Sequence, residues 1–219
     1  MKKLLLSLTI ASAALTASAQ DNQVRFGVKA GVAFPTVSIS EKTETDIKMN
    51  TSFYVGGTAD IPVGEIFSIQ PGITFLGKGF KTSDSQTESG AKIEGTVKSN
   101  VWYIEVPVNV LANFPVGDGK VFIGAGPYYG YAISGKNKTE GTVTQDGQKL
   151  KVSTSEDVEF GKDGSHKRGD FGVNFLGGYQ LSNGFNIHAG YGLGLSSISQ
   201  ESDVKVKNRV LSVGVGFTF

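Results

Sequence analysis

The sequence of 219 residues contains no cysteine. Disulfide bonds and thiolate metal centres are therefore excluded, and stability must come from backbone hydrogen bonds and buried surface. Histidine is also scarce: His166 and His188 stand apart and form no metal-ligand spacing. We accordingly predict no metal ion and no cofactor.

Long apolar runs are missing beyond the first segment of the chain. No later stretch approaches the roughly 18 apolar residues that indicate a transmembrane helix. The chain also lacks an excess of charge of either sign, because the formal net charge is only +1. Near neutrality gives no electrostatic basis for binding a polyanion such as DNA or RNA, so we predict no nucleic-acid partner.

The first residues have the pattern of an export signal. Lys2 and Lys3 precede an apolar run over 4–15, and Ala17-Ser18-Ala19 follows with small side chains. This order of charge, apolar run and small residues predicts a secretory signal peptide over 1–19, cleaved before Gln20. Its loss would change the net charge from +1 to −1.

Glycine and phenylalanine are abundant, with 30 and 14 residues respectively. Glycine is a poor residue for helix interiors, and no long helical periodicity follows the signal segment. Alternation of apolar with polar or small residues, which is typical of strands, recurs instead. We predict eight strands, at 23–34, 52–61, 66–78, 101–114, 120–133, 170–181, 185–195 and 209–219.

The connections between these segments alternate strictly in length. Short ones follow the second, fourth and sixth segments, so the long polar ones should all emerge at one end and both termini at the other. The third long connection contains an Asp146-Gly147 turn signal within a weakly alternating stretch. It therefore suggests strands continuing as hairpins, and a surface partner would bind here. The long connections cover 38–50, 81–99, 135–169 and 196–208.

Alternation leaves open whether the apolar face points into a core or into lipid. A secreted β-sandwich or a lipocalin-like barrel would bury it, whereas a membrane barrel displays it. The opposite face here is rich in glycine, and aromatic residues such as Trp102 and Phe114 lie near segment ends. These features favour an all-β fold: an eight-stranded antiparallel up-and-down transmembrane β-barrel over 20–219, with short periplasmic turns and long extracellular loops.

Several segments resemble a known family. "YIEVPV", "GPYYGY", "RGDFGVNFLGGY" and the terminal "VGVGFTF" are similar to PorT-like small outer-membrane β-barrel proteins, the family of the outer membrane protein beta-barrel domain. The resemblance implies eight strands, termini in the periplasm and loops outside the cell. It brings no uniform catalytic or ligand site.

Charged residues on the inner face form the candidate site. Because an unpaired buried charge costs several kcal/mol, mixed signs suggest a salt-bridged plug. A gated or selective path through the barrel is the alternative interpretation. The predicted lumen network consists of Arg25, Lys29, Asp60, Lys78, Glu105, Asp170 and His188.

The last strand carries a second expectation. Val213, Val215, Phe217 and Phe219 should face lipid, and a terminal Phe after alternating apolar residues resembles the assembly signal of outer-membrane barrels. We therefore expect the barrel-assembly machinery and outer-membrane lipids as partners of a monomer.

Function follows only coarsely from these features. Neither histidine lies in a recognisable nucleophile motif, so we predict a non-catalytic protein of the cell outer membrane with a structural or surface-interaction role. Narrow porin-like passage of a small solute is the alternative, followed by a lipid-modifying enzyme.

Overall fold

The structure is a computed structural model that describes residues 23–40, 46–88, 91–145, 148–161, 164–201 and 203–219. The predicted signal peptide and the Asp146-Gly147 turn lie outside these residues. No helix in the described ranges is long and apolar enough to cross a membrane. Their strands are β1 Arg25–Ile39, β2 Ile47–Lys48, β3 Ser52–Pro62, β4 Phe67–Glu88, β5 Ala91–Val116, β6 Gly119–Gln145, β7 Gln148–Asp157, β8 Gly169–Leu181, β9 Phe185–Gly194 and β10 Val206–Thr218.

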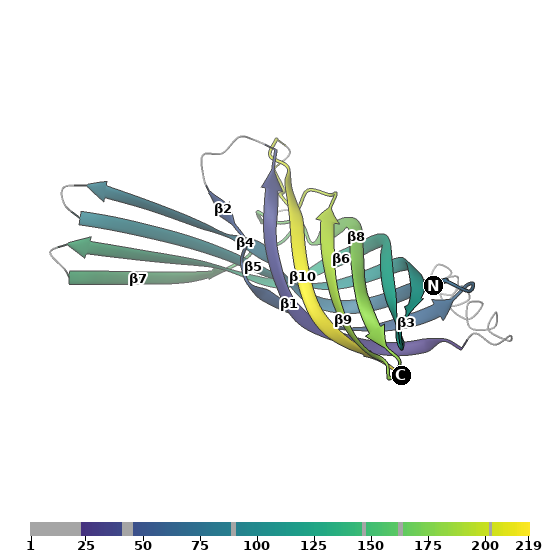
Figure 1. Ribbon diagram of the computed structural model, residues 1–219. Coiled ribbons are helices and arrows are strands. Elements are labelled where there is room, and N and C mark those ends of the chain that lie inside the picture. Colours follow the sequence, from purple (N-terminus) through teal and green to yellow (C-terminus); the bar gives the residue numbers. More distant parts are fainter. Residues whose placement is uncertain (1–22, 41–45, 89–90, 146–147, 162–163, 202) are drawn as a thin grey trace.

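Eight strands close into an antiparallel ring in the order β1-β3-β4-β5-β6-β8-β9-β10 (Figure 1). β10 returns to pair with β1, from Gly27 opposite Thr218 to Ile39 opposite Val206. Closure leaves no unpaired strand edge in the ring, as a sheet surrounded by lipid requires. The predicted eight-stranded barrel is confirmed.

The two faces of the barrel wall are inverted relative to a soluble protein. Apolar side chains such as Ile73, Ile123 and Ile187 point outward with more than half of their surface exposed, whereas Tyr103 and Tyr128 fill the interior at 0% and 2% exposure. Lipid, rather than a protein core, therefore covers the apolar face.

Glycines on the inner face make room for these large side chains. A Cβ placed on Gly214 would meet the Tyr54 hydroxyl and the backbone of β1, and one on Gly172 would lie 2.6 Å from the Tyr128 ring. An eight-stranded barrel is only wide enough for packed side chains, so large residues on some strands require glycine on others.

Short turns join the strands at one end of the barrel. Gly117 and Gly184 adopt φ values of 59° and 91° there, in the left-handed region that glycine enters without steric cost. The Phe219 amide donates to the Phe26 carbonyl oxygen at 2.8 Å, which ties the end of the chain to the first strand. Both ends of the ring therefore lie with the short turns, as predicted.

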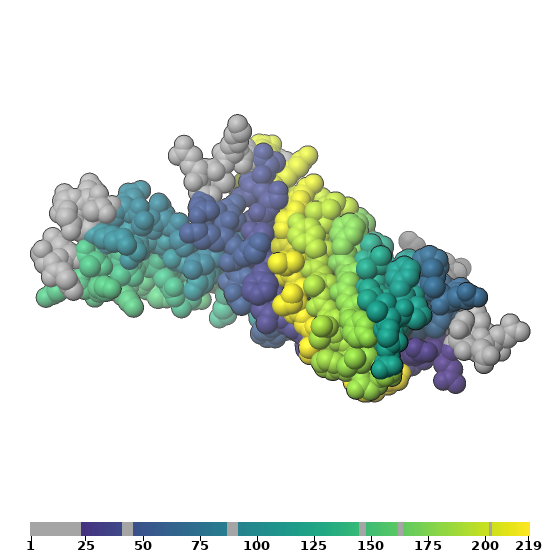
Figure 2. Space-filling model, viewed as in Figure 1, coloured from purple at the N-terminus to yellow at the C-terminus, as the bar shows by residue number. Residues whose placement is uncertain are grey.

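Beyond the other end of the barrel, strands continue into two of the long connections, as the expected hairpins would. β4 and β5 continue as strands through most of 81–99, and β6 extends to Gln145 before β7 pairs with it. Together β4, β5, β6 and β7 form a four-stranded sheet that projects from the barrel, here called the extracellular sheet (Figures 1 and 2). Its alternation was weak in the sequence because both of its faces meet water.

Candidate functional site: the barrel lumen and the extracellular sheet

A buried ion cluster crosses the lumen near its extracellular end. Lys78 on β4 places its Nζ 2.7 Å from Glu105 Oε2 on β5 and 2.9 Å from Asp170 Oδ2 on β8. All three residues are at most 5% exposed. A single ammonium group thus joins three strands, and we call these residues the lumen plug.

Neighbouring polar groups complete the plug. Asn208 Nδ2 and the Tyr128 hydroxyl donate to Asp170 Oδ2 at 2.9 and 3.3 Å, and Asn174 Nδ2 donates to Glu105 Oε1 at 3.0 Å. The Lys78 ammonium also lies 4.2 Å from the centroid of the Tyr128 ring, within cation–π range. The carboxylates therefore keep hydrogen-bond partners in place of the water they lost.

The connection between β7 and β8 and the connection between β9 and β10 cover the plug on its extracellular side. Val158 and Ile198 are buried, and Val158 packs with Val101, Tyr103 and Ala132. The Lys167 amide donates to the Ile198 carbonyl at 2.8 Å and so ties the two segments together. We call this covering layer the cap.

His166 lies in the cap. Its Nδ1 is 3.2 Å from Ser165 Oγ, and its ring meets the Phe160 ring edge-on. Partial burial lowers the pKa of His166, because desolvation penalises the charged imidazolium.

Below the plug the lumen contains a cavity of about 120 Å³, lined by both polar and apolar side chains. Its lining reaches from Glu105 to residues at the periplasmic rim, including Asp60, Lys120 and Gln180. Four lining oxygens, each buried, have no hydrogen-bond partner in the described residues: Asp60 Oδ1, Thr74 Oγ1, Asn109 Oδ1 and Asn113 Oδ1. The cavity is thus suited to water or to a small molecule that donates hydrogen bonds.

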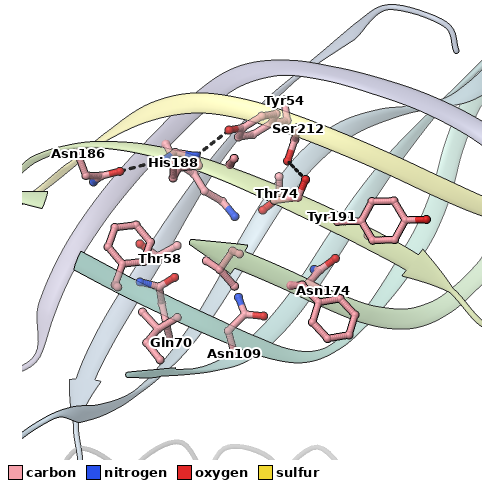
Figure 3. Close-up of a pocket in the computed structure, with 18 of the residues that line it drawn as sticks. Tyr54, Thr58, Gln70, Thr74, Asn109, Asn174, Asn186, His188, Tyr191 and Ser212 are labelled. Carbon is pink, nitrogen blue, oxygen red and sulfur yellow. Dashed lines mark hydrogen bonds between the residues drawn. The ribbon is translucent and has the colours of Figure 1, made fainter. Parts of the chain in front are cut away.

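His188 occupies one wall of this cavity (Figure 3). Its Nδ1 is 2.9 Å from Asn186 Oδ1, and its Nε2 is 2.7 Å from the Tyr54 hydroxyl. Because a carbonyl oxygen only accepts, Nδ1 carries the proton, and the Tyr54 hydroxyl donates to Nε2 of a neutral ring. Both ring nitrogens are engaged, so His188 serves here to orient Tyr54.

The predicted lumen residues separate into three groups. Lys78, Glu105 and Asp170 meet in the plug, whereas Lys29 and His188 line the cavity. Asp60 lies 3.9 Å from Lys120 Nζ rather than pairing with Arg25, which is exposed at the rim although its register position faces Asp60. Arg25, a predicted member of the lumen network, therefore makes no ion pair among the described residues.

Sequence reasoning did not single out Lys120, Asn174 or Asn208. Lys120 is the first residue of the predicted strand 120–133 and lies on the inner face of β6, but it was not included in the predicted lumen network. Asn208 was placed in a long loop, but β10 begins at Val206, so its side chain enters the lumen at 1% exposure. The alternation within 120–133 places Lys120 on the inner face, and extending the last predicted strand by one residue would have found Asn208.

No group of three metal-ligating side chains occurs in the part of the chain that the structure describes. His166 and His188 lie in the cap and in the cavity wall, and their side chains contact Ser165, Asn186 and Tyr54 through hydrogen bonds. The hydroxyls among these partners are those of Ser165, in the cap, and Tyr54, in the cavity wall.

The extracellular sheet has two unlike faces. The face continuous with the lumen carries Ile93, Val97, Val143 and Leu150, all more than a third exposed. The opposite face, continuous with the lipid-facing surface, carries lysines and a few acids. Hydrogen bonding and charge from Lys138, 2.6 Å away, lower the pKa of Glu140. The lysines on this face include Lys81, Lys92, Lys98, Lys136, Lys138, Lys149 and Lys151.

A closed eight-stranded antiparallel barrel with an apolar exterior defines an integral membrane protein of the outer-membrane type. The family model described as "Outer membrane protein beta-barrel domain" matches residues 18–200, and the chain belongs to this family. The narrower resemblance to PorT-like proteins stays a prediction. No curated protein matches the chain.

Several solved barrels are similar in structure. Ail of Yersinia pestis shares 15% identity and covers 90% of this chain and 99% of its own, with a TM-score of 0.39. Neisserial surface protein A shares 15% identity over 89% and 97%, with a TM-score of 0.40. OprG of Pseudomonas aeruginosa shares 12% over 90% and 97%, with a TM-score of 0.36.

Proposed function

We propose that this outer-membrane protein is a closed, non-catalytic barrel that anchors the extracellular sheet as a surface for interaction. The lumen plug carries the proposal. Lys78, Glu105 and Asp170 bridge three strands without exposed surface, and the cap lies over them. A filled lumen leaves no continuous aqueous path, as is usual for barrels of eight strands.

The sheet supplies the surface role. It extends β4, β5 and β6 well beyond the plug, and every side chain of β7 is exposed. Long ordered extensions that contribute nothing to closing the barrel are better explained by contact with a partner than by stability.

Conductance in planar bilayers tests the closed state. We expect the unaltered protein to give no discrete current steps, and the triple variant Lys78→Ala/Glu105→Ala/Asp170→Ala to give them. A matched triple on the extracellular sheet, Lys92→Ala/Glu94→Ala/Asp157→Ala, should remain silent. Steps in the unaltered protein that vanish on narrowing the lumen with Gly130→Leu would contradict closure.

Binding of a small polar solute from the periplasmic side is a second candidate function. The four unpartnered oxygens of the cavity favour it, because buried acceptors without partners are rare in proteins. Titration with glycerol should shift the side-chain amide signal of Asn109 in NMR spectra and leave exposed Asn183 unchanged. Equal shifts at both positions would exclude a specific site.

A further inference from the structure

The outer edge of the extracellular sheet is open along its full length. β7 pairs with β6 on one side, from Lys136 opposite Asp157 to Gln145 opposite Gln148, and within the described residues no strand pairs with its other side. Figure 1 shows β7 as the free margin of the projection. The opposite margin is less open, because β2 pairs with β4 at Lys81 and Thr82. A ten-residue edge offers unpaired backbone groups to another strand.

The charges of β7 are divided between its two halves. Its sequence, QKLKVSTSED, has Lys149 and Lys151 near the start and Glu156 and Asp157 at the end. In an antiparallel pair of two such strands, the basic half of each lies opposite the acidic half of the other. With Ser153 facing Ser153, Lys149 faces Asp157 and Val152 faces Thr154, and no like charges are opposed.

Other pairings lack this complementarity. A parallel, in-register pair places Lys149 opposite Lys149 and Asp157 opposite Asp157, and like charges directly opposite destabilise a sheet. If β7 paired instead with the β4 edge of a neighbouring copy at the same height above the membrane, Lys151 would face Ser85 and Val152 would face Asp84. This arrangement gains no ion pair. The charge pattern therefore selects an antiparallel second copy.

We propose that the β7 edge binds the β7 edge of a second copy in an opposing membrane. Two antiparallel β7 strands point their barrels in opposite directions, so both copies cannot sit in one bilayer. In this register nine residues of each strand overlap, from Lys149 to Asp157, and at about 3.3 Å each they span roughly 30 Å. The protein is thus a homotypic adhesin between outer membranes; this rests on the proposed surface role and names its partner.

Charge reversal in proteoliposomes tests the pairing. Vesicles of phosphatidylcholine carrying the unaltered protein should cluster, as measured by light scattering. Lys149→Glu/Lys151→Glu makes β7 uniformly acidic, and Glu156→Lys/Asp157→Lys makes it uniformly basic. Each variant alone should cluster roughly tenfold less, because like charges then face one another. The control Lys205→Glu/Lys207→Glu changes the net charge by the same amount as the acidic variant but lies away from β7, and it should cluster normally.

Mixing the two β7 variants gives the decisive result. Acidic and basic strands are complementary in the antiparallel arrangement, so a mixture should regain clustering between differently labelled vesicles. Failure of the mixture while the unaltered protein clusters would overturn antiparallel self-pairing and indicate another contact.

Cysteine cross-linking fixes the register, because the chain has no cysteine of its own. Ser153→Cys should form a disulfide between copies in different vesicles, whereas Ser155→Cys, displaced from the centre of the pair, should not. Cross-linking confined to copies within one vesicle would overturn the opposing-membrane arrangement.

Current recordings on the same protein separate this proposal from the proposed function. Clustering by a protein that conducts would contradict only the closed barrel. Vesicles that neither conduct nor cluster would contradict self-pairing and leave the closed anchor standing.

Discussion

β4, β5 and β6 each pass from lipid into water, and β5 reverses its amphipathic pattern between the two. In the barrel part of β5, Ile104 and Val106 face outward while Glu105 faces the lumen. Beyond Trp102 the outward positions carry Lys98 and Lys92, and the inward positions carry Val97 and Ile93. The reversal occurs where lipid gives way to water, so the pattern along one strand records its surroundings.

The boundary itself is marked by aromatic rings and a bulge. Trp102 lies between Phe53 and Phe75, with ring centroids 4.7 and 4.8 Å away. The pairing of β5 with β6 shifts register between Trp102 and Tyr103. Rings of this kind occupy the membrane interface, and the bulge allows the extracellular sheet to leave the curvature of the barrel.

Removing the Lys78 charge from the lumen plug should give the largest difference in stability between a barrel variant and an extracellular-sheet variant. Lys78→Met leaves two buried carboxylates without their cation and should lower the free energy of unfolding by about 3–5 kcal/mol. Lys98→Met breaks an exposed pair with Glu140 at 3.7 Å, and the loss should stay below about 1 kcal/mol. Urea titration of both variants in lipid vesicles measures the difference, and similar losses would show that the plug is not a buried ion cluster.

A charge placed on an exposed valine should have different effects in the lipid-facing barrel and in the water-facing sheet. Val108 and Val152 are 41% and 60% exposed, but Val108 lies in the middle of the barrel part of β5 and Val152 on the extracellular sheet. Val108→Arg should cost about 2–4 kcal/mol in lipid. Val152→Arg should change stability by less than about 0.5 kcal/mol. Should Val108→Arg insert with unchanged stability, the membrane register of β5 would be wrong.

Glycine replacements compare crowding in the two regions. Gly214→Ala forces a Cβ against the Ala30 carbonyl and the Tyr54 hydroxyl, and overpacking of this kind costs about 1–3 kcal/mol. Gly141 on the extracellular sheet has nothing within 4 Å of such a Cβ, so Gly141→Ala should be neutral or slightly stabilising. Heat-dependent gel mobility gives the order of stabilities, and a less stable Gly141 variant would indicate that this glycine has an unseen contact.

The difference between the barrel and the extracellular sheet also explains how much of the fold the sequence could predict. The barrel was predictable because lipid on one side and crowded side chains on the other enforce full alternation, from Val28 to Phe217. The extracellular sheet was foreseen only as hairpins that continue the third to sixth predicted strands, without their bounds, since Thr, Ser and Gly at positions such as Thr96 and Gly141 suit a strand or a loop equally.

Partners within the lumen were harder to predict than the residues themselves. Alternation placed Lys78, Glu105 and Asp170 on the inner face, but their meeting depends on the stagger between β4, β5 and β8. Glu105 lies opposite Thr74 in the strand pairing, so Lys78 reaches it diagonally. Which inner-face side chains reach one another is set by the closed ring, and no pattern in the sequence indicates it.

The smallest expected effect concerns the cap. Burial lowers the pKa of His166 in the closed cap, whereas an opened cap would leave the ring near its ordinary value of about 6.5. The open form therefore binds more protons below that pH, so the closed cap is most stable above it and loses stability as the pH falls. Hydrogen exchange of the Lys167 amide, which donates to Ile198, should accelerate relative to its intrinsic rate between pH 7.5 and 5.5. His166→Gln should remove this dependence, and a relative rate that stays constant in the unaltered protein would contradict the role of His166 in holding the cap.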